Sequence, residues 1–285
     1  MFRVFIVNPN SGKGKSNYIV GQIEKKLCSL NEPYRIIYTS KKRSASSIAE
    51  EYKDIANIKI YSVGGDGTLN QIINGLIGTK NVLCIIPTGT ANDFIKSIDS
   101  NYKGLVDVIK INNKYAINVV SFGLDAKVAY NANLIKDNKL SSSSVYTSSF
   151  LKEFPKYKDE ELYINGIKTS TTLLAICNGK YYGGKYKISP SANINDGFLE
   201  MYLASNIKRY KMPLLALKLM SGKLENHKLV EHSRIKNLNI NSNKDIFCNI
   251  DGEIIKDNNF EIKVLNNALN IEYTDEFNIK KILIK

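Results

Sequence analysis

Strand-like and helix-like patterns alternate through roughly the first 115 residues of the chain. Short apolar runs typical of strands lie at residues 4–7, 34–38, 58–63, 82–86 and 106–111. Between them, apolar residues recur at helical spacing, as in Ile19, Ile23 and Leu27. Strands that alternate with helices form parallel sheets with crossover helices. This half is therefore predicted to be an α/β domain built on a parallel sheet.

Glycine-rich loops follow three of these strands. They cover residues 8–16, 63–70 and 87–94, with the sequences NPNSGKGKS, VGGDGTLN and PTGTANDF. Glycine permits positive φ and the close approach of a bulky anion, and a helix that begins behind such a loop presents unpaired N–H groups to it. In open parallel sheets, ligands bind at the carboxyl ends of the strands. The three loops therefore predict a ligand site suited to phosphate.

Each loop also has a purely structural interpretation. The first could be a solvated turn, and it is not a P-loop, because Pro9 stands where GxxxxGKS requires glycine. The second could be a tight turn in which Asp66 caps a helix, and in the third Thr90 or Asn92 would cap a helix well. If the second loop binds phosphate, Asp66 is an anion beside an anion. We therefore expect it to bind a cation or transfer a proton rather than to bind the phosphate itself.

From about residue 115 onward the pattern favours antiparallel β structure. Asn165-Gly166 lies between two strand-like runs and is typical of a type I′ hairpin turn. This half is predicted to be an antiparallel β-sandwich or barrel with a few helices. The predicted boundaries are residues 1–118 for the α/β domain and 119–274 for the sandwich domain, followed by a tail at 275–285 that could pack back on the first domain. The active site is expected in the cleft between the two halves.

Two carboxylate motifs belong to the second half. Asp125, in the sequence FGLDA, could cap a helix or contribute to a site. Asp251 and Glu253 belong to the sequence IDGE, in which Asp-Gly is a common hairpin turn. The functional interpretation makes Asp251 a general base, with Glu253 orienting or supporting it.

The chain is strongly basic. Lys and Arg number 40 against 27 Asp and Glu, which gives a net charge of +13. Such an excess favours nucleic acid, an anionic membrane or phosphorylated substrates as partners. Because the lysines are spread along the chain, we expect a general attraction to anionic surfaces rather than a nucleic-acid-binding arm.

Apolar segments and cysteines indicate where in the cell the protein is expected. No apolar run reaches the ~20 residues that span a bilayer. The segment 212–220 is predicted to be a core-facing helix rather than a membrane anchor, with Pro213 at its start. The N-terminus lacks the apolar core of a signal peptide. The four cysteines form no C-x-x-C pair and are predicted to be buried free thiols in a reducing compartment.

Seven motifs occur in an order that is familiar from one family. They are NPNSG, GGDGT, PTGTANDF, FGLDA, YYGG at 181–184, SPSANINDG at 189–197 and IDGE at 250–253. With them the chain resembles the diacylglycerol kinase catalytic family of bacterial lipid kinases, which includes relatives of the sphingosine and ceramide kinases. The resemblance covers nearly the whole chain. The match is weaker at residues 94–96, where many members have small and basic residues.

The resemblance implies an enzyme that transfers the γ-phosphoryl group of ATP, with Mg²⁺, to a lipid hydroxyl. Diacylglycerol is the first choice of acceptor, with phosphatidic acid as the product. The residues implied in ATP binding are Asn8, Pro9, Asn10, Ser11, Gly12, Lys13 (or Lys15), Thr39, Ser40, Gly64, Gly65, Asp66, Gly67, Thr68, Leu69, Asn70, Thr88, Gly89, Thr90 and Asn92.

The resemblance also implies metal and catalytic roles. Asp66, Asp93 and Asp125 would form an aspartate–water–magnesium network. A separate structural Mg²⁺ would be bound by backbone carbonyls of Asn193 and Phe198 and by the Asp196 carboxylate, although a turn without metal is the alternative. Asp251 would take the proton from the acceptor hydroxyl, with Glu253 and Asp66 completing the catalytic set.

Two other functions are compatible with parts of the sequence. One is a soluble-substrate kinase similar to NAD kinase, which shares GGDGT; the sandwich motifs and IDGE favour the lipid branch. The other is a non-catalytic lipid- or nucleotide-binding protein, which the presence of Asp66 and Asp251 argues against. The expected partners are ATP and a lipid at a membrane surface, not nucleic acid, and sandwich edges could pair into a homodimer. The expected location is the cytoplasm, with reversible, salt-sensitive association with the inner face of the membrane.

Overall fold

The computed structural model describes residues 1–135, 142–184 and 186–273. They form two units. The N-terminal unit contains Met1–Val106 and the end of strand β13 (Glu253–Glu272) from Asn267 onward, and the sandwich unit contains Asp107–Asn266. The predicted tail at 275–285 lies outside the described residues.

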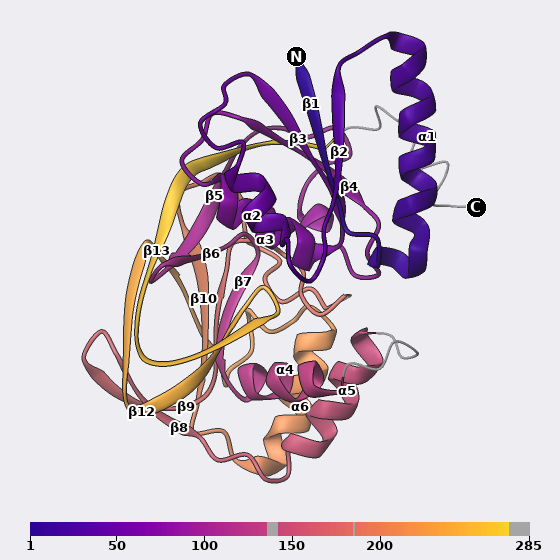
Figure 1. The fold of residues 1–285 in the computed structure, drawn as a ribbon. Helices are drawn as coiled ribbons and strands as arrows, with labels where there is room; N and C mark the ends of the chain where they lie inside the picture. Colours follow the sequence, from indigo (N-terminus) through magenta and orange to yellow (C-terminus); the bar gives the residue numbers. More distant parts are fainter. Residues whose placement is uncertain (136–141, 185, 274–285) are drawn as a thin grey trace. The chain divides into compact units, whose positions relative to one another are not determined.

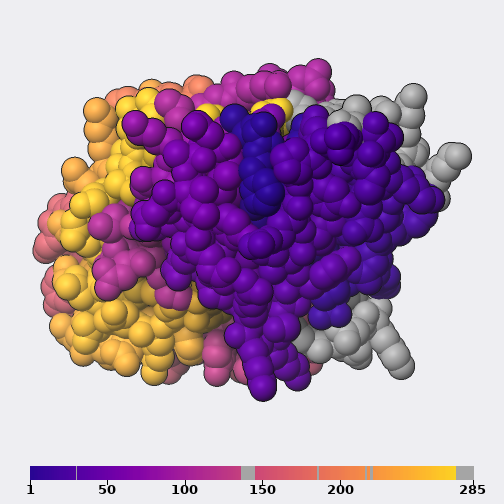
Figure 2. Space-filling view, turned by 45° about the horizontal axis from the view of Figure 1, so that its top comes forward, coloured from indigo at the N-terminus to yellow at the C-terminus, as the bar shows by residue number. Residues whose placement is uncertain are grey.

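A parallel sheet forms the centre of the N-terminal unit (Figure 1). Its strands are β1 (Phe2–Val7), β2 (Tyr34–Tyr38), β3 (Ile58–Gly64) and β4 (Val82–Pro87). They pair in parallel in the order β4-β3-β1-β2, and the end of β13 lies parallel to β4 on the other side. The helices are α1 (Lys15–Leu30), α2 (Ala45–Glu50) and α3 (Asp66–Leu76), with two 3₁₀ turns, η1 (Ser11–Gly14) and η2 (Phe94–Ser97). The atoms of this unit, indigo to violet, form one continuous body in the space-filling view (Figure 2).

Both faces of this sheet are buried, and its side chains alternate between them. Phe5, Val7 and Tyr61 point to the face covered by α1, where they pack with Ile19 and Ile23. The residues between them point to the opposite face, because the side-chain period of a strand is two. A sheet buried on both faces reads as continuous apolar runs, as the sequence of β1 does. The predicted strands and the helix containing Ile19 and Ile23 are confirmed.

The segment after β4 differs from its prediction. We expected PTGTANDF to begin a regular helix, but only the short 3₁₀ turn η2 follows it. Asn92 has φ 50°, and Asp93 bonds the side chain of Lys96 within the turn. The left-handed Asn92 keeps helical geometry from starting earlier. The turn ends after four residues because Ile98 is extended, with φ −122° and ψ 155°.

Antiparallel strands form the sandwich unit. They are β5 (Lys103–Ile111), which begins in the N-terminal unit, β6 (Lys114–Ala116), β7 (Val119–Gly123), β8 (Glu160–Ile164), β9 (Ile167–Cys177), β10 (Leu199–Ser205), β11 (Glu231–Ile235), β12 (Asn237–Ile250) and β13. One apolar core lies among these strands. It contains Phe122 and Phe260, whose ring centroids lie 5.0 Å apart in an edge-to-face contact.

Three helices belong to a second core of the same unit (Figure 1). They are α4 (Leu124–Leu134), α5 (Ser142–Glu153) and α6 (Met212–Met220), the last preceded by the 3₁₀ turn η3 (Arg209–Lys211). Their apolar residues pack with the outer faces of β7, β9 and β10, for example Val128 and Met212 with Tyr202. The sandwich unit thus has one core between strands and one beneath helices.

Two hairpin turns use left-handed backbone. Asn165 and Gly166 have φ 48° and 81° between β8 and β9, which confirms the predicted hairpin. Asp251 and Gly252 have φ 48° and 94° between β12 and β13. The structural interpretation of IDGE as a hairpin turn is therefore correct, and it leaves a catalytic role open.

The cysteines and helices bear on two further expectations. Cys84, Cys177 and Cys248 are buried free thiols as predicted, but Cys28 is exposed because it follows the core residue Leu27 on the outer side of α1. Burial raises the pKa of the Cys177 and Cys248 thiols well above the ordinary value. Among the residues described, no helix is long and apolar enough to cross a bilayer.

Candidate active site

The carboxyl ends of β1, β3 and β4 bring the three glycine-rich loops together in the N-terminal unit. Asn8 Nδ2 donates to Thr68 Oγ1 at 3.1 Å, which joins the first loop to the second. Thr88 Oγ1 donates to Ser11 Oγ at 2.9 Å, which joins the third loop to the first. The Thr88 N–H also donates to the carbonyl of Gly64 at 2.8 Å. All three loops are thus fixed to one another before any ligand binds.

Two glycine contacts explain why these loops need glycine. A Cβ on Gly12, which has φ 60°, would lie 2.0 Å from the Thr88 carbonyl oxygen. A Cβ on Gly89 would lie 2.5 Å from the Cα of Gly65. Backbone therefore packs directly against backbone, which side chains would prevent.

Two helix N-termini lie at this edge of the sheet. Helix α1 begins behind Gly14 and α3 behind Gly65, and neither has a side-chain cap. A Cβ added to Gly67, in the first turn of α3, would meet nothing within 4 Å. Uncapped N–H groups that face open space are the arrangement that binds phosphate at helix N-termini. The alternative in which Asp66 caps α3 is wrong, because Gly65 holds that position.

Asp66 and Asp93 lie together on the second and third loops. Asp66 Oδ1 accepts the Asp93 N–H at 2.7 Å, and Asp93 Oδ1 accepts from Lys96 Nζ at 2.8 Å. Carboxylates with water form the usual Mg²⁺ shell, so this pair has suitable ligands for a hydrated magnesium ion, which would have to displace Lys96 from Asp93. No preassembled group of three metal-ligating side chains occurs within the described residues. The remaining ligands would come from phosphate and water.

The other predicted nucleotide contacts occupy different positions around these loops. The Thr39 N–H donates to the Val7 carbonyl at 2.8 Å, which places Thr39 and Ser40 beside the first loop. Leu69 and Asn70 are buried in α3, and the Leu69 N–H already donates to the Gly65 carbonyl at 3.0 Å, so these two residues support the loop rather than contact a ligand. Exposed or half-exposed members include Pro9, Asn10, Lys13, Thr39, Ser40, Thr90 and Asn92.

Asp125 has a separate polar network in the sandwich unit. The Tyr146 and Ser121 hydroxyls donate to its two carboxylate oxygens. Asn249 Nδ2 donates to Tyr182 Oη at 2.6 Å and approaches Asp125 Oδ2 at 3.4 Å. Burial, and secondly the charge of Asp125, raise the pKa of Tyr146 and Tyr182 well above 10. Both tyrosines therefore keep their protons.

An apolar cavity of about 330 Å³ opens beside Asp125. Side chains of α4, α5, β9 and α6 line it, including Leu173 and Leu215. Asp125 is the only charged residue in the lining as far as the described residues show. A cavity with apolar walls and one carboxylate suits a ligand that has a hydrocarbon body and one polar end.

The IDGE turn holds its two carboxyl groups differently. The Asp251 carboxylate accepts backbone N–H groups of Ile117, Asn118 and Val119 at 2.7–3.1 Å. Glu253 is 54% exposed and pairs with Lys114. Asp251 therefore fixes the turn to the start of β7, while Glu253 faces solvent.

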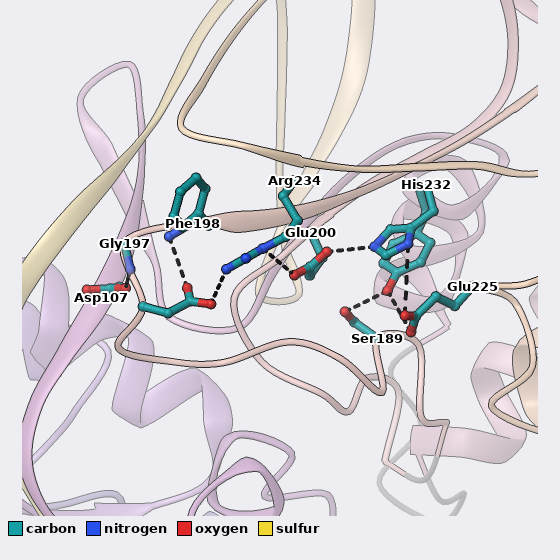
Figure 3. Close-up of polar contacts among 10 residues, drawn as sticks. Asp107, Ser189, Gly197, Phe198, Glu200, Glu225, His232 and Arg234 are labelled. Atoms are coloured by element: carbon teal, nitrogen blue, oxygen red, sulfur yellow. Dashed lines mark hydrogen bonds and ion pairs between the residues drawn. The ribbon is translucent and has the colours of Figure 1, made fainter.

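A cation of the protein itself, Arg234 of β11, contacts the loop predicted to bind a second magnesium (Figure 3). Asp196 Oδ1 accepts the Phe198 N–H at 3.0 Å, and Oδ2 bonds the Arg234 guanidinium, which also lies 4.3 Å from the centre of the Phe198 ring. Arranged this way, the loop does not fit a bound Mg²⁺ unless Arg234 moves away. No observation tests the second magnesium predicted at Asn193, Asp196 and Phe198, for which Arg234 is the competing partner of Asp196.

Figure 3 shows that Arg234 continues into a larger network. Arg234 Nε lies 3.3 Å from Glu200 Oε1, and His232 Nε2 lies 2.6 Å from Glu200 Oε2. The imidazole of His232 stacks on Tyr202 at 4.7 Å. The network joins β10 and β11 to the loop before β10.

Several residues around the site were not predicted. Tyr182 and Asn249 lie within or directly before quoted motifs, YYGG and IDGE, and polar residues beside motifs were the available signal. Tyr146 and Arg234 had no such signal. Their roles depend on contacts with Asp125 and Asp196, which are distant in the sequence.

Comparisons with known proteins agree with the fold. Residues 3–122 match the model of the diacylglycerol kinase catalytic domain, and residues 118–273 match that of the YegS C-terminal NAD kinase beta sandwich-like domain. A diacylglycerol kinase of Staphylococcus epidermidis is 27% identical over 87% of this chain and 84% of its own length. A Yersinia enterocolitica protein named "Probable lipid kinase YegS-like" is 28% identical over 91% of this chain and 93% of its own.

A solved structure shows the same fold. A diacylglycerol kinase of Bacillus anthracis str. Sterne superposes with a TM-score of 0.71 at 20% identity, covering 95% of this chain and 96% of that one. Because the two family models together cover nearly the whole described chain, this protein belongs to the lipid kinase family that joins a diacylglycerol kinase catalytic domain to a YegS-type β-sandwich domain.

Proposed function

We propose that the protein transfers the γ-phosphoryl group of ATP to the hydroxyl of a lipid, with diacylglycerol as the preferred acceptor and Mg²⁺ as cofactor. The observation that carries the proposal is the apolar cavity beside Asp125 in a chain whose other unit presents three phosphate-type loops. The relatives named as diacylglycerol kinases support the same acceptor.

The ATP phosphates are proposed to bind the loops at the carboxyl edge of the parallel sheet. The uncapped N-termini of α1 and α3 supply N–H donors, and Lys13 or Lys15 supplies charge. Asp66 and Asp93 would hold a magnesium ion that neutralises the charge developing on the phosphates. That Asp125 joins this ion, and that the two units enclose the substrates in a cleft, stay predictions.

The base that accepts the hydroxyl proton is proposed to come from the IDGE turn. The sequence favours Asp251. Its three N–H donors stabilise the ionised carboxylate, however, and make it a weaker proton acceptor. Glu253 is the more exposed carboxyl group of the turn, and its ion-pair partner, the partly exposed Lys114, is a flexible side chain that can turn away, unlike the backbone N–H groups that hold Asp251. We therefore assign proton transfer to Glu253 and the fixing of the turn to Asp251.

The lining of the cavity also favours a lipid acceptor over a dinucleotide. Apolar walls such as Leu124, Phe150 and Ile188 offer few hydrogen-bonding groups to a dinucleotide, although the sandwich domain resembles that of NAD kinase. A hydrocarbon chain fits such walls. The cytoplasmic location and the homodimer stay predictions.

The test is radiolabelled phosphoryl transfer from Mg-ATP in mixed detergent micelles. The panel contains diacylglycerols of several chain lengths, a sphingoid base, a prenol and NAD. We expect transfer to diacylglycerol and a loss on the order of 100-fold or more for Asp66→Asn. Thr147→Trp, which places a large ring at the exposed edge of the cavity, should reduce transfer to long-chain lipids without changing ATP binding. Transfer to NAD but to no lipid would overturn the proposal.

A further inference from the structure

Helix α6 exposes apolar side chains on the side away from the core. Met212 and Leu215 are buried, as the prediction of a core-facing helix requires. Leu214 and Leu217, however, are 46% and 61% exposed, and Tyr210 in the preceding turn η3 is 72% exposed. The three exposed residues follow one another at i, i+4 and i+7, so they share one side of the helical path.

Two exposed apolar side chains lie at the mouth of the apolar cavity. Leu217 lines the cavity although it is largely exposed, and the same holds for Leu151 of α5, which is 64% exposed. A residue that both lines a cavity and faces solvent marks its opening. We call Leu151, Tyr210, Leu214 and Leu217 the apolar rim. Such a grouping of exposed apolar residues is unusual for a surface that faces only water.

The segment that carries most of the apolar rim is strongly basic. The segment from residue 206 to 228 contains one acidic residue, Glu225, against six basic ones: Lys208, Arg209, Lys211, Lys218, Lys223 and Lys228. Glu225 is itself directed at His232 and Tyr202. The charge beside the rim is therefore complementary to an anionic surface.

A second cavity, of about 260 Å³, lies beside η3. Lys208, Lys211 and Lys228 line it, against one acidic residue, Glu231. Three ammonium groups around a polar cavity suit a phosphate group. The apolar rim and the lysine cavity thus offer sites for the two chemical parts of an anionic phospholipid, one beside the other along the chain.

We propose that η3 and α6 dock this protein on an anionic phospholipid bilayer. Leu214 and Tyr210 enter the boundary between headgroups and acyl chains, and the lysine cavity takes a phospholipid headgroup. A short helix with apolar residues on one side and lysines beside them lies in the interface and does not span the bilayer. The proposal rests on the proposed function only in that the lipid acceptor would enter the cavity at the rim.

The sequence provides a direct test, because the chain contains no tryptophan. In Leu214→Trp, the single indole is expected to shift its emission to the blue when phosphatidylcholine vesicles containing phosphatidylglycerol are added. The matched control is Ile167→Trp, which is 71% exposed at the β8–β9 hairpin and should not shift. No shift at position 214, or an equal shift at 167, would overturn the proposal, and an equal shift with pure phosphatidylcholine would overturn its anionic part.

Flotation with the same vesicles gives the second measurement. Tyr210→Glu/Leu214→Glu leaves the lining of the apolar cavity intact and should lower vesicle binding on the order of tenfold or more. Lys208→Gln/Lys211→Gln/Lys228→Gln should lower it and reduce its salt dependence. If a second copy of the chain covers the rim instead, the protein elutes as a dimer and the Leu214→Trp variant emits in the blue without vesicles, which contradicts the proposal.

Neither measurement uses ATP or an acceptor lipid. Docking without phosphoryl transfer to any lipid in micelles would therefore refute the proposed function alone. Transfer in micelles without vesicle binding would refute the docking surface alone. The Tyr210→Glu/Leu214→Glu protein should also retain its activity in micelles and lose it on vesicles, because only the second substrate must be reached through a bilayer.

Discussion

Gly89 illustrates how single residues determine the phosphate loops. Its backbone packs against Gly65, and Asn92 Oδ1 would lie 2.8 Å from an added Cβ. The sequence indicated that these loops need glycine for their conformation. It did not indicate that the glycines are needed because two loops contact each other through their backbones, since Gly65 and Gly89 are separated by a helix and a strand.

We predict that Gly89→Ala separates the second and third loops. Overpacking of this kind costs about 1–3 kcal/mol of the free energy of unfolding. Thermal unfolding and ATP titration should both show the loss. Gly21→Ala is the matched control, because a Cβ there meets nothing within 4 Å in the middle of α1. It should stabilise the protein by up to about 1 kcal/mol.

The two carboxyl groups of the IDGE turn give a second prediction. Asp251→Asn turns an amide toward the N–H groups of Ile117 and Val119, so it should lower the free energy of unfolding by about 1–3 kcal/mol as well as activity. Glu253→Gln should leave the melting temperature unchanged and lower kcat on the order of 100-fold or more. Full activity of Glu253→Gln, with an inactive Asp251→Asn that melts like the parent, would restore Asp251 as the base.

At the scale of elements, the loop before β10 depends on a strand that follows it. Asp196 and Arg234 are joined through β10 and β11, whose antiparallel register pairs Glu200 with Arg234. The sequence predicted the hairpin at Asn165-Gly166 because its turn residues are local. It could not predict the partner of Asp196, because that partner is set by the register of a later strand. The network of Tyr146 on Asp125 was missed because it depends on how α5 packs on α4, which no local pattern specifies.

We predict that Arg234, rather than Mg²⁺, neutralises Asp196. Removal of Mg²⁺ with EDTA should therefore leave the melting temperature of the unmodified protein unchanged. Arg234→Met should lower the free energy of unfolding by roughly 1–2 kcal/mol, because nearly buried Glu200 also loses a partner, although Arg234 is half exposed and solvent weakens the pairing. Added Mg²⁺ should then restore stability to the variant. A lower melting temperature of the parent in EDTA would place a metal in this loop after all.

At the scale of the whole molecule, buried tyrosines link stability to alkaline pH. Burial is the main cause that raises the pKa of Tyr146, Tyr157, Tyr182 and Tyr202 above 10. In the unfolded chain, tyrosine ionises near pH 10. Below that pH both states hold the proton and the contribution to stability is constant. Above it only the unfolded state loses the proton, so stability falls as pH rises.

The expected slope is about 1.4 kcal/mol of the free energy of unfolding per pH unit for each such tyrosine. Denaturant titrations at a series of pH values above 10 measure it. Tyr146→Phe should reduce this slope by the amount that one tyrosine contributes. Because lysines contribute equally to the slopes of the parent and the variant, their contribution cancels in the difference. An unchanged slope would mean that Tyr146 ionises equally in both states.

Strand β13 has a consequence for how the protein is made. It pairs with β12 in the sandwich unit and, from Asn270 to Glu272, with β4 in the N-terminal unit, where Glu272 bonds Lys59 at 2.8 Å. The sheet that carries the phosphate loops is therefore complete only when residues near 270 have left the ribosome. During translation the edge of β4 therefore stays unpaired from the time the first hundred or so residues emerge until β13 is synthesised. A chaperone that binds exposed strand edges would find its target in this nascent chain.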